Sequence, residues 1–359
     1  MKVGIVGLPN AGKSSLFTAL TGVAAEAANY PFTTIEPNVA IVPVADERLD
    51  AVAATVKASK VVPDTIAFHD IAGLVAGAHR GEGLGNRFLA NIRETDAILH
   101  VVRTHEDPNV VHPDGRVDPL ADIETIETEL IYADLEQAER RLERVAKTAK
   151  SGDRRAIAEA QWLTELIEAL QAGRPARTVP PSPDAPDAIA QLAPLSAKPV
   201  LFVANVEEGS DEVPAAVAEH ARAVGAGAVA VSARLQSELS EFEVQDAAAI
   251  RAELGLAQSG LEIVIRGAFS LLELVAFFTA GEDKPAQSWH LRRGLSVWHA
   301  AGMIHSDIQR GFVRAEVVAW NDLVDTGGYA GARDRGMLRL EGRDYPVADG
   351  DVITVKFTP

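Results

Sequence analysis

The stretch Gly7-Leu8-Pro9-Asn10-Ala11-Gly12-Lys13-Ser14 follows directly after an apolar run over Val3–Val6. This G-x-x-x-x-G-K-S pattern predicts a strand, a glycine-rich turn and the start of a helix. Such a turn directs successive backbone N–H groups at one point, and the helix adds the positive end of its dipole. The pattern therefore predicts a nucleoside-triphosphate site, in which the Lys13 ammonium reaches the phosphates and the Ser14 hydroxyl contacts Mg²⁺. The residues expected to line the phosphates are Asn10, Ala11, Gly12, Lys13, Ser14 and Ser15.

Composition narrows the class of protein. A chain of 359 residues predicts two or three domains. No run approaches the roughly 20 apolar residues that span a bilayer, no signal peptide precedes the first strand, and there is no cysteine. These features predict a cytoplasmic protein. The net charge of −17 argues against broad electrostatic binding, so we expect no DNA or membrane partner. A local basic cluster lies between Arg140 and Arg155, for which a solvated helix face is the simpler interpretation.

Apolar runs and helical patterns alternate along much of the chain, which predicts an α/β fold with a doubly wound sheet. Ligands of such sheets bind at the carboxyl ends of the strands. The strands are expected at residues 3–6, 38–44, 65–70, 97–102, 200–204 and 228–231.

A helical segment interrupts the predicted sheet. Apolar residues recur at spacings of three and four over 131–145 and again over 156–170, which predicts an antiparallel hairpin with coiled-coil spacing. From Leu274 onward, short strands around one helix suggest a small mixed α/β module. The expected domains are a nucleotide-binding domain over 1–121 and 196–273, an inserted helical arm over 122–195, and a last domain over 274–359.

A second phosphate-directed motif, Asp70-Ile71-Ala72-Gly73, follows the third predicted strand. An aspartate there can hold a Mg²⁺-bound water, and the Gly73 N–H can contact the γ-phosphate. Thr34 lies between the two motifs, where a switch threonine that closes on Mg²⁺ is expected. The predicted metal ligands are therefore Ser14, Thr34 and Asp70. Because Leu74 cannot hydrogen-bond, another group must orient the attacking water.

Taken together, these motifs resemble the Obg superfamily of P-loop NTPases, and more narrowly its YchF branch, the Obg-like ATPases. The resemblance covers almost the whole chain, including the helical insert. It implies that the last module is a β-grasp-like TGS domain and that the ribosome is a partner. The motifs that carry it lie at residues 7–15, 30–38, 70–75, 81–96, 278–281 and 301–315.

The base-recognition motif departs from the GTPase pattern. GTPases of this superfamily carry N-K-x-D after a strand, whereas this chain has Asn205-Val206-Glu207-Glu208. A glutamate cannot keep the paired hydrogen bonds that aspartate makes to guanine, each worth roughly 1.5–3 kcal/mol. The resemblance implies ATP use, with Asn205 and the Val206 backbone facing adenine and Ser232 in the last base-contact loop. Spacing favours Glu208 over Glu207 as the residue that faces the base.

Two residues could compensate for the missing glutamine, His112 by acting on the attacking water and Asn10 by holding a cation. On the sequence alone, His112 is most simply a solvent-exposed loop histidine. The resemblance instead implies that it takes part in hydrolysis, since histidine can orient water or exchange a proton near neutral pH. For Asn10, two interpretations stay open: it shapes the loop, or, as the resemblance to related hydrolases with a hydrophobic residue at the Leu74 position implies, it helps hold K⁺ against the phosphates.

The sequence thus predicts an Mg²⁺-dependent ATPase that acts as a nucleotide-controlled, ribosome-associated switch. Three alternatives remain: a GTP-specific switch of the Obg type, a small-molecule or nucleotide kinase, and a binding scaffold whose nucleotide is structural. No acceptor pocket or arginine-bearing lid can be identified for the kinase.

Overall fold

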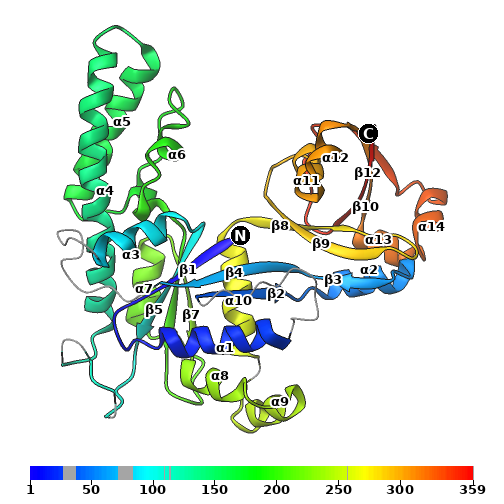
Figure 1. Ribbon diagram of the computed structural model, residues 1–359, viewed down its shortest axis with the longest axis horizontal. Coiled ribbons are helices and arrows are strands. Elements are labelled where there is room, and N and C mark those ends of the chain that lie inside the picture. The colour runs from blue at the N-terminus through cyan, green and yellow to red at the C-terminus, as the bar shows by residue number, and fades with distance from the viewer. Residues whose placement is uncertain (27–37, 72–83, 109, 113–114, 257, 359) are drawn as a thin grey trace. The chain divides into compact units, whose positions relative to one another are not determined.

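The computed structural model describes the whole chain except residues 27–37, 72–83, 109, 113–114, 257 and 359 (Figure 1). Its contacts divide the described residues into two compact units. The first contains residues 1–26, 38–41 and 67–271, and the second contains residues 42–66 and 272–359. None of the described helices is both long and apolar enough to cross a lipid bilayer.

The first unit is built on a six-stranded sheet in the order β2-β4-β1-β5-β6-β7. Strands β4, β1, β5, β6 and β7 pair in parallel, and every residue of β5 and β6 is buried. Continuous apolar runs are expected of strands covered on both faces. The predicted strands are therefore confirmed, with bounds β1 (Lys2–Val6), β2 (Val39–Val44), β4 (Asp64–Asp70), β5 (Ala97–Arg103), β6 (Val200–Asn205) and β7 (Gly227–Val231).

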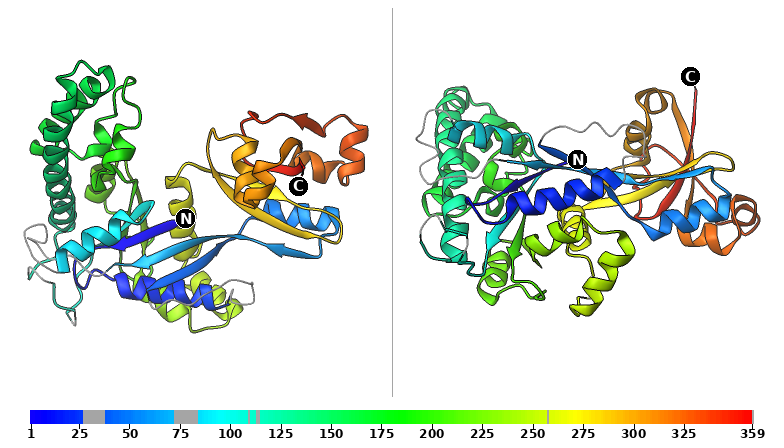
Figure 2. Two further views of the ribbon diagram at one scale, coloured as in Figure 1. Left: turned by 45° about the horizontal axis from the view of Figure 1, so that its top comes forward. Right: turned by 60° about the horizontal axis from the view of Figure 1, so that its bottom comes forward.

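Helices cover both faces of this sheet, as a doubly wound fold requires (Figures 1 and 2). On one face, Phe88, Ile123 and Val217 from three helices pack in one cluster with Phe202 of β6. On the other face, the last helix of the unit contacts β5, β6 and β7. The helices are α1 (Lys13–Glu26), α3 (Leu84–Arg93), α4 (Pro119–Ala149), α5 (Arg154–Gln171), α6 (Ala188–Leu192), α7 (Ala215–Ala223), α8 (Ala233–Leu239), α9 (Val244–Glu253) and α10 (Gly260–Leu271).

Helices α4 and α5 form the predicted hairpin, which Figure 1 shows as a long arm joined to the sheet at the start of α4. Asp118 and Asp153 cap the two helices, accepting from Ala121 N at 3.2 Å and from Ala156 N at 2.9 Å. The apolar stripes meet in a cluster that includes the buried Trp162. The stripe is therefore a packing seam, as the spacing predicts.

Two acidic side chains of α4, one fully buried and one partly buried, fix the root of the arm. The fully buried carboxylate of Asp134 accepts from Leu195 N, Ser196 N and Ser196 Oγ at 2.6–2.7 Å, at the turn that leads into β6. Glu127 pairs with Arg177 at 3.0 Å. Buried charges persist only where hydrogen bonds replace lost hydration, so these contacts fix the arm's root.

A buried histidine lies in β5 beside this root. His100 is 2% exposed, its ring lies 5.4 Å from that of Phe202, and its Nε2 has no hydrogen-bond partner among the described residues. Burial, aided by electrostatic interactions with His220 and Lys13, lowers the pKa of His100 to about 3. The native state therefore holds the neutral ring, whereas the unfolded chain takes up a proton below a pH of about 6.5.

We expect His100 to make the fold acid-sensitive. Its folded-state pKa is depressed, so stability is present above pH 6.5 and is lost as the pH falls toward 3. Between pH 6.5 and 4.5 the loss is about 2–3 kcal/mol. Urea unfolding of wild type and His100→Leu across this range should therefore diverge by that amount. Parallel pH profiles for the two proteins would show that His100 is not the sensitive group.

The second unit contains a six-stranded sheet in the order β11-β10-β12-β8-β9-β3. Its core joins Phe277, Ala300, Val317 and Ile353 from strands and a helix. The strands are β3 (Lys60–Val62), β8 (Leu274–Thr279), β9 (Pro285–Arg292), β10 (Phe312–Ala319), β11 (Arg339–Glu341) and β12 (Asp351–Phe357). The helices are α2 (Glu47–Val56), α11 (Val297–Ile304), α12 (Ser306–Arg310), α13 (Trp320–Asp325) and α14 (Tyr329–Asp334).

Residues 42–66 group with the C-terminal unit, whereas the domain bounds expected from the sequence include them in the nucleotide-binding domain. Strand β3 pairs in parallel with β9, more than 200 residues later in the chain. Arg48 of α2 bonds to Asp46 and to Asp349, each at 2.7 Å. These long-range contacts, which no local pattern encodes, account for the difference.

Candidate functional site

The candidate site lies at the carboxyl edge of the first sheet, where strand register brings several predicted residues together. Ile5 of β1 lies opposite Asp70 of β4, so the glycine-rich loop and the aspartate leave adjacent strand ends. Further along the edge, Arg103 lies opposite Asn205, and Asn205 opposite Val231. The phosphate-binding and base-binding motifs therefore meet at one edge, as expected for ligands of parallel sheets.

Two glycines let the phosphate loop approach its neighbours. A Cβ on Gly7 would lie 2.4 Å from the Val101 carbonyl oxygen, and one on Gly12 would lie 2.3 Å from Asn205 Nδ2. Gly12 also has φ +102°, which side chains rarely adopt. Asn10 takes a left-handed conformation with φ +62°, which asparagine tolerates better than most residues. The loop shape thus depends on these residue types.

Lys13 begins α1 and is only 8% exposed. Its Nζ donates to the Leu8 carbonyl oxygen at 2.7 Å. Burial lowers the pKa of Lys13, and the nearby Asp70 carboxylate opposes that shift. In turn, burial raises the pKa of Asp70, and Lys13 opposes it. An ammonium that has lost hydration gains strongly from a phosphate anion, so the site is built to take negative charge.

The hard oxygen donors expected for Mg²⁺ fit this edge. Ser14 is exposed in the first turn of α1, and Asp70 ends the adjacent strand. Hydroxyl and carboxylate oxygens are suitable Mg²⁺ ligands when phosphates and waters complete the shell. Ser15 is half-buried beside Ser14. The described residues contain no cluster of three or more histidine or acidic side chains that could hold a metal. Thr34, Gly73 and Leu74 lie outside the described residues.

Asn205 links two parts of the site through its side-chain hydrogen bonds. Its Nδ2 donates to the Ala11 carbonyl oxygen at 3.0 Å, and its Oδ1 accepts from Ala233 N at 3.0 Å. The side chain therefore ties the phosphate loop to the start of α8. Its predicted position beside the base stays a prediction, but the structure adds a role in shaping the loop.

The other residues predicted to contact the base lie close to Asn205 in the chain or on the neighbouring strand end. Val206 is buried, and its N–H donates to the Val231 carbonyl oxygen at 3.1 Å. Ser232 caps α8, its Oγ accepting from Leu235 N at 3.4 Å. Glu207 and Glu208 are both exposed, and Glu208 lies 3.5 Å from the Arg234 guanidinium. The same Arg234 Nε donates to Glu238 at 2.9 Å, so Glu208 takes part only in the longer, exposed contact.

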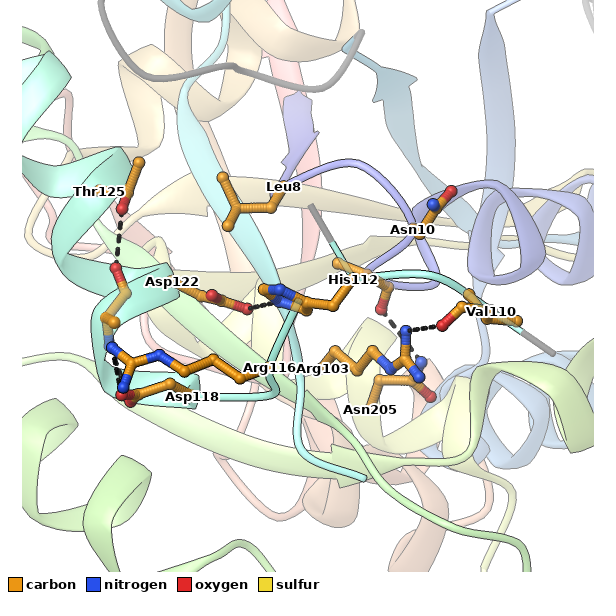
Figure 3. A network of polar contacts seen from close by, with 12 residues as sticks. Leu8, Asn10, Arg103, Val110, His112, Arg116, Asp118, Asp122, Thr125 and Asn205 are labelled. Atoms are coloured by element: carbon orange, nitrogen blue, oxygen red, sulfur yellow. Dashed lines mark hydrogen bonds and ion pairs between the residues drawn. The ribbon is translucent and has the colours of Figure 1, made fainter. Parts of the chain in front are cut away.

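The segment after β5 is held by a buried arginine that the sequence analysis did not single out. The guanidinium of Arg103, 3% exposed, donates to the carbonyl oxygens of His105 at 3.0 Å, Val110 at 2.9 Å and Asp107 at 3.3 Å. Asn10 of the phosphate loop donates through Nδ2 to the Val111 carbonyl oxygen at 2.9 Å. The loop that carries His112 is therefore fixed to the strand end by Arg103 (Figure 3) and to the phosphate loop by Asn10.

His112 is buried rather than solvent-exposed, which corrects the simpler interpretation of the sequence. Its Nε2 lies 3.0 Å from Asp122 Oδ2, and both side chains are less than a tenth exposed. Asp122 belongs to the first turn of α4 (Figure 3). The histidine thus connects the phosphate-loop region to the root of the arm. In the sequence, Asp122 is marked as a partner of His112 only by its place ten residues later, near the start of a helix.

Two protein-family models match the chain. One, described as YchF-GTPase_C, a protein of unknown function, matches residues 274–358. The other, described as 50S ribosome-binding GTPase, matches residues 2–141. The two matches therefore cover the N-terminal and C-terminal parts of the chain and leave residues 142–273 between them.

Several known proteins are similar to this chain over almost its whole length. The protein named ribosome-binding ATPase YchF in Bacillus subtilis (strain 168) is 47% identical over 363 residues, covering 99% of each chain. The protein of that name in Escherichia coli O157:H7 is 45% identical over 359 residues, again 99% of each chain. A solved structure, that of the Schizosaccharomyces pombe YchF GTPase, is 33% identical with a TM-score of 0.87 and covers 99% of this chain and 97% of that one.

Proposed function

The chain belongs to the YchF family, and we propose that it is a cytoplasmic, Mg²⁺-dependent ATPase that acts as a nucleotide-controlled switch on the ribosome. The observation that carries this proposal is the meeting of the phosphate loop, Asp70 and the 205–208 motif at one sheet edge. The relatives' names supply the ribosome as the partner.

We infer the following roles at the phosphates. The loop amides and Lys13 hold the phosphate oxygens, and Ser14, Thr34 and Asp70 hold Mg²⁺. The Gly73 N–H contacts the γ-phosphate. When bound, Mg²⁺ neutralises charge on the phosphates. The lost hydration of Lys13 favours the bound anion, since a buried charge gains more from a partner than an exposed one.

His112 is our candidate for orienting the attacking water, because Leu74 offers no hydrogen bond. The ring contacts Asp122 in the structure, so turning toward the γ-phosphate exchanges this contact for one with water. Arg103 and Asn10 also hold this loop through hydrogen bonds. The loop must therefore change its conformation before the ring can move. Slow hydrolysis without a partner is therefore expected.

Asn10 has a further proposed role. Its Nδ2 donates a hydrogen bond to the Val111 carbonyl oxygen, and its side-chain oxygen has lone pairs that can coordinate a cation. K⁺ held there would add positive charge beside the phosphates. Comparing hydrolysis in K⁺ and Na⁺ buffers tests the role, since only a dedicated site distinguishes the two ions.

GTP use is the second candidate, because the matched N-terminal family model and the fission-yeast structure are both described as GTPases. The base motif favours ATP, since Glu208 replaces the aspartate and Val206 the lysine of the guanine-binding pattern. A non-hydrolysing scaffold predicts no phosphate release with ribosomes and K⁺ present. One binding assay and one hydrolysis assay therefore distinguish an ATPase, a GTPase and a non-hydrolysing scaffold.

Rebuilding the guanine motif should reverse base preference. In Val206→Lys/Glu208→Asp, two restored charge-assisted hydrogen bonds to guanine, worth roughly 1.5–3 kcal/mol each, should shift the ratio of GTP to ATP affinity by about 10²- to 10⁴-fold. Isothermal titration with both nucleotides measures this. The matched control, Val206→Lys/Glu207→Asp, has the same composition with the acid misplaced and should not shift. Wild type that binds GTP more tightly than ATP would overturn the assignment.

A further inference from the structure

Positive charge is concentrated at the end of the arm where α4 turns into α5, although the protein as a whole is acidic. Residues 140–155 contain seven Lys and Arg and two acidic side chains, whereas the whole chain has 34 basic and 51 acidic residues. Figure 1 shows this end of α4 and α5 farthest along the arm from the sheet. We call residues 140–155 the basic tip.

Several cations of the basic tip are exposed and have no acidic partner. Arg140 pairs with Glu136, Arg141 with Glu159 and Arg155 with Asp187. Among the described residues, no ion pair is found for four further exposed cations. These are Arg144, Lys147, Lys150 and Arg154. Arg140, Arg144 and Lys147 follow at spacings of four and three, so they share one face of α4.

Helix stability does not account for the whole cluster. Lys147 and Lys150 at the end of α4 are favourable, because the helix dipole attracts cations there. Arg154 and Arg155, however, occupy the first turn of α5, which contains no acidic residue. Cations at a helix start cost roughly 0.3–1 kcal/mol each. The N-cap Asp153 and the Arg155–Asp187 pair offset part of this cost. Arg154 is therefore the cation at this helix start for which helix stability gives no reason, and it is free to meet a negatively charged ligand.

We propose that the basic tip binds the phosphate backbone of RNA, and this proposal rests on the proposed association with the ribosome. Within the basic tip no large apolar side chain is exposed, and the isolated Ile157, 38% exposed and two residues beyond it, forms no apolar face. Protein interfaces use aromatic or aliphatic anchors, and membrane-surface helices need an apolar face, so neither partner fits. Closely spaced, exposed cations without acidic partners are suited to a polyanion whose charges repeat along a backbone.

The arm connects this surface to the nucleotide site. Helix α4 contains 31 residues and is therefore about 46 Å long. Its first turn carries Asp122, the partner of His112, and its last turns carry Arg144 and Lys147. RNA bound at the tip thus contacts the same helix whose root holds the proposed water-orienting histidine.

The test uses the full chain with Arg144→Gln, Lys147→Gln and Lys150→Gln combined. The matched control, Arg174→Gln/Arg222→Gln/Arg266→Gln, removes three exposed cations elsewhere in the same unit. Binding is measured to ribosomes and to ribosomal RNA stripped of protein, across a salt series. Thermal unfolding and ATP titration check that both variants fold and bind nucleotide.

We expect the tip variant to bind ribosomes and stripped RNA at least tenfold more weakly than the control. The magnitude of its slope of log affinity against log salt should fall by about 0.7–0.9 for each lost phosphate contact. Equal affinity of the tip variant and the control would overturn the proposal. So would a tip variant that loses ribosome binding when wild type ignores stripped RNA, since the partner would then be protein. Wild type that binds stripped RNA through the tip but not ribosomes would leave this proposal standing and overturn the ribosome association instead.

Discussion

Replacing Lys13 by methionine should lower kcat/KM for ATP hydrolysis by about 10³-fold, because the variant loses the charge that stabilises the transferred phosphate. The protein itself should stay folded. Burial already lowers the pKa of this ammonium, so its removal relieves a desolvation cost and methionine fills the same space. Phosphate release and urea unfolding measure the two effects.

The matched control is Lys2→Met, which removes an exposed lysine from the start of β1. It should leave hydrolysis and nucleotide affinity unchanged. A Lys13→Met protein that still hydrolyses ATP within tenfold of wild type would show that the reaction occurs at another site. Loss of activity with loss of the folded state would point to a structural role for Lys13.

Replacing His112 by alanine should lower kcat by about 10²- to 10⁴-fold, the usual contribution of a general acid or base. The Kd for ATP should hardly change, because the ring is not expected to contact the ground-state nucleotide. Single-turnover hydrolysis and ATP titration separate the two quantities. Val111→Ala, which truncates the 77% exposed neighbour on the same loop, is the control and should retain wild-type kcat.

The His112 variants need a second check, because alanine leaves the buried Asp122 without this partner. His112→Asn keeps a hydrogen-bond donor at the position but cannot exchange a proton. It should be as inactive as His112→Ala while unfolding closer to wild type. If both variants keep kcat within threefold of wild type, the water is oriented by another group.

Local patterns predicted much of the first unit. The apolar runs of β1, β5 and β6 identified their strands because these strands are buried on both faces. The spacing of apolar residues predicted the hairpin because α4 and α5 bury only one stripe each. In both cases the hydrophobic period of the sequence matches the geometry of the element.

Long-range polar contacts could not be predicted in this way. The buried Arg103 is satisfied by three carbonyl oxygens of its own loop, and no periodicity indicates such a fold of the backbone. The burial of His112 depends on the position of Asp122, which only the packing of α4 fixes. Strand β3 joins the second sheet through a partner far along the chain. Each of these depends on tertiary structure rather than on local propensity.

The most direct test of the central claim is a crystal structure of the full chain with Mg²⁺ and a non-hydrolysable ATP analogue. We predict the triphosphate on the amides of residues 10–15 with Lys13 at its phosphates, and adenine beside residues 205–208. An empty phosphate loop, or a purine bound away from Asn205, would contradict the account.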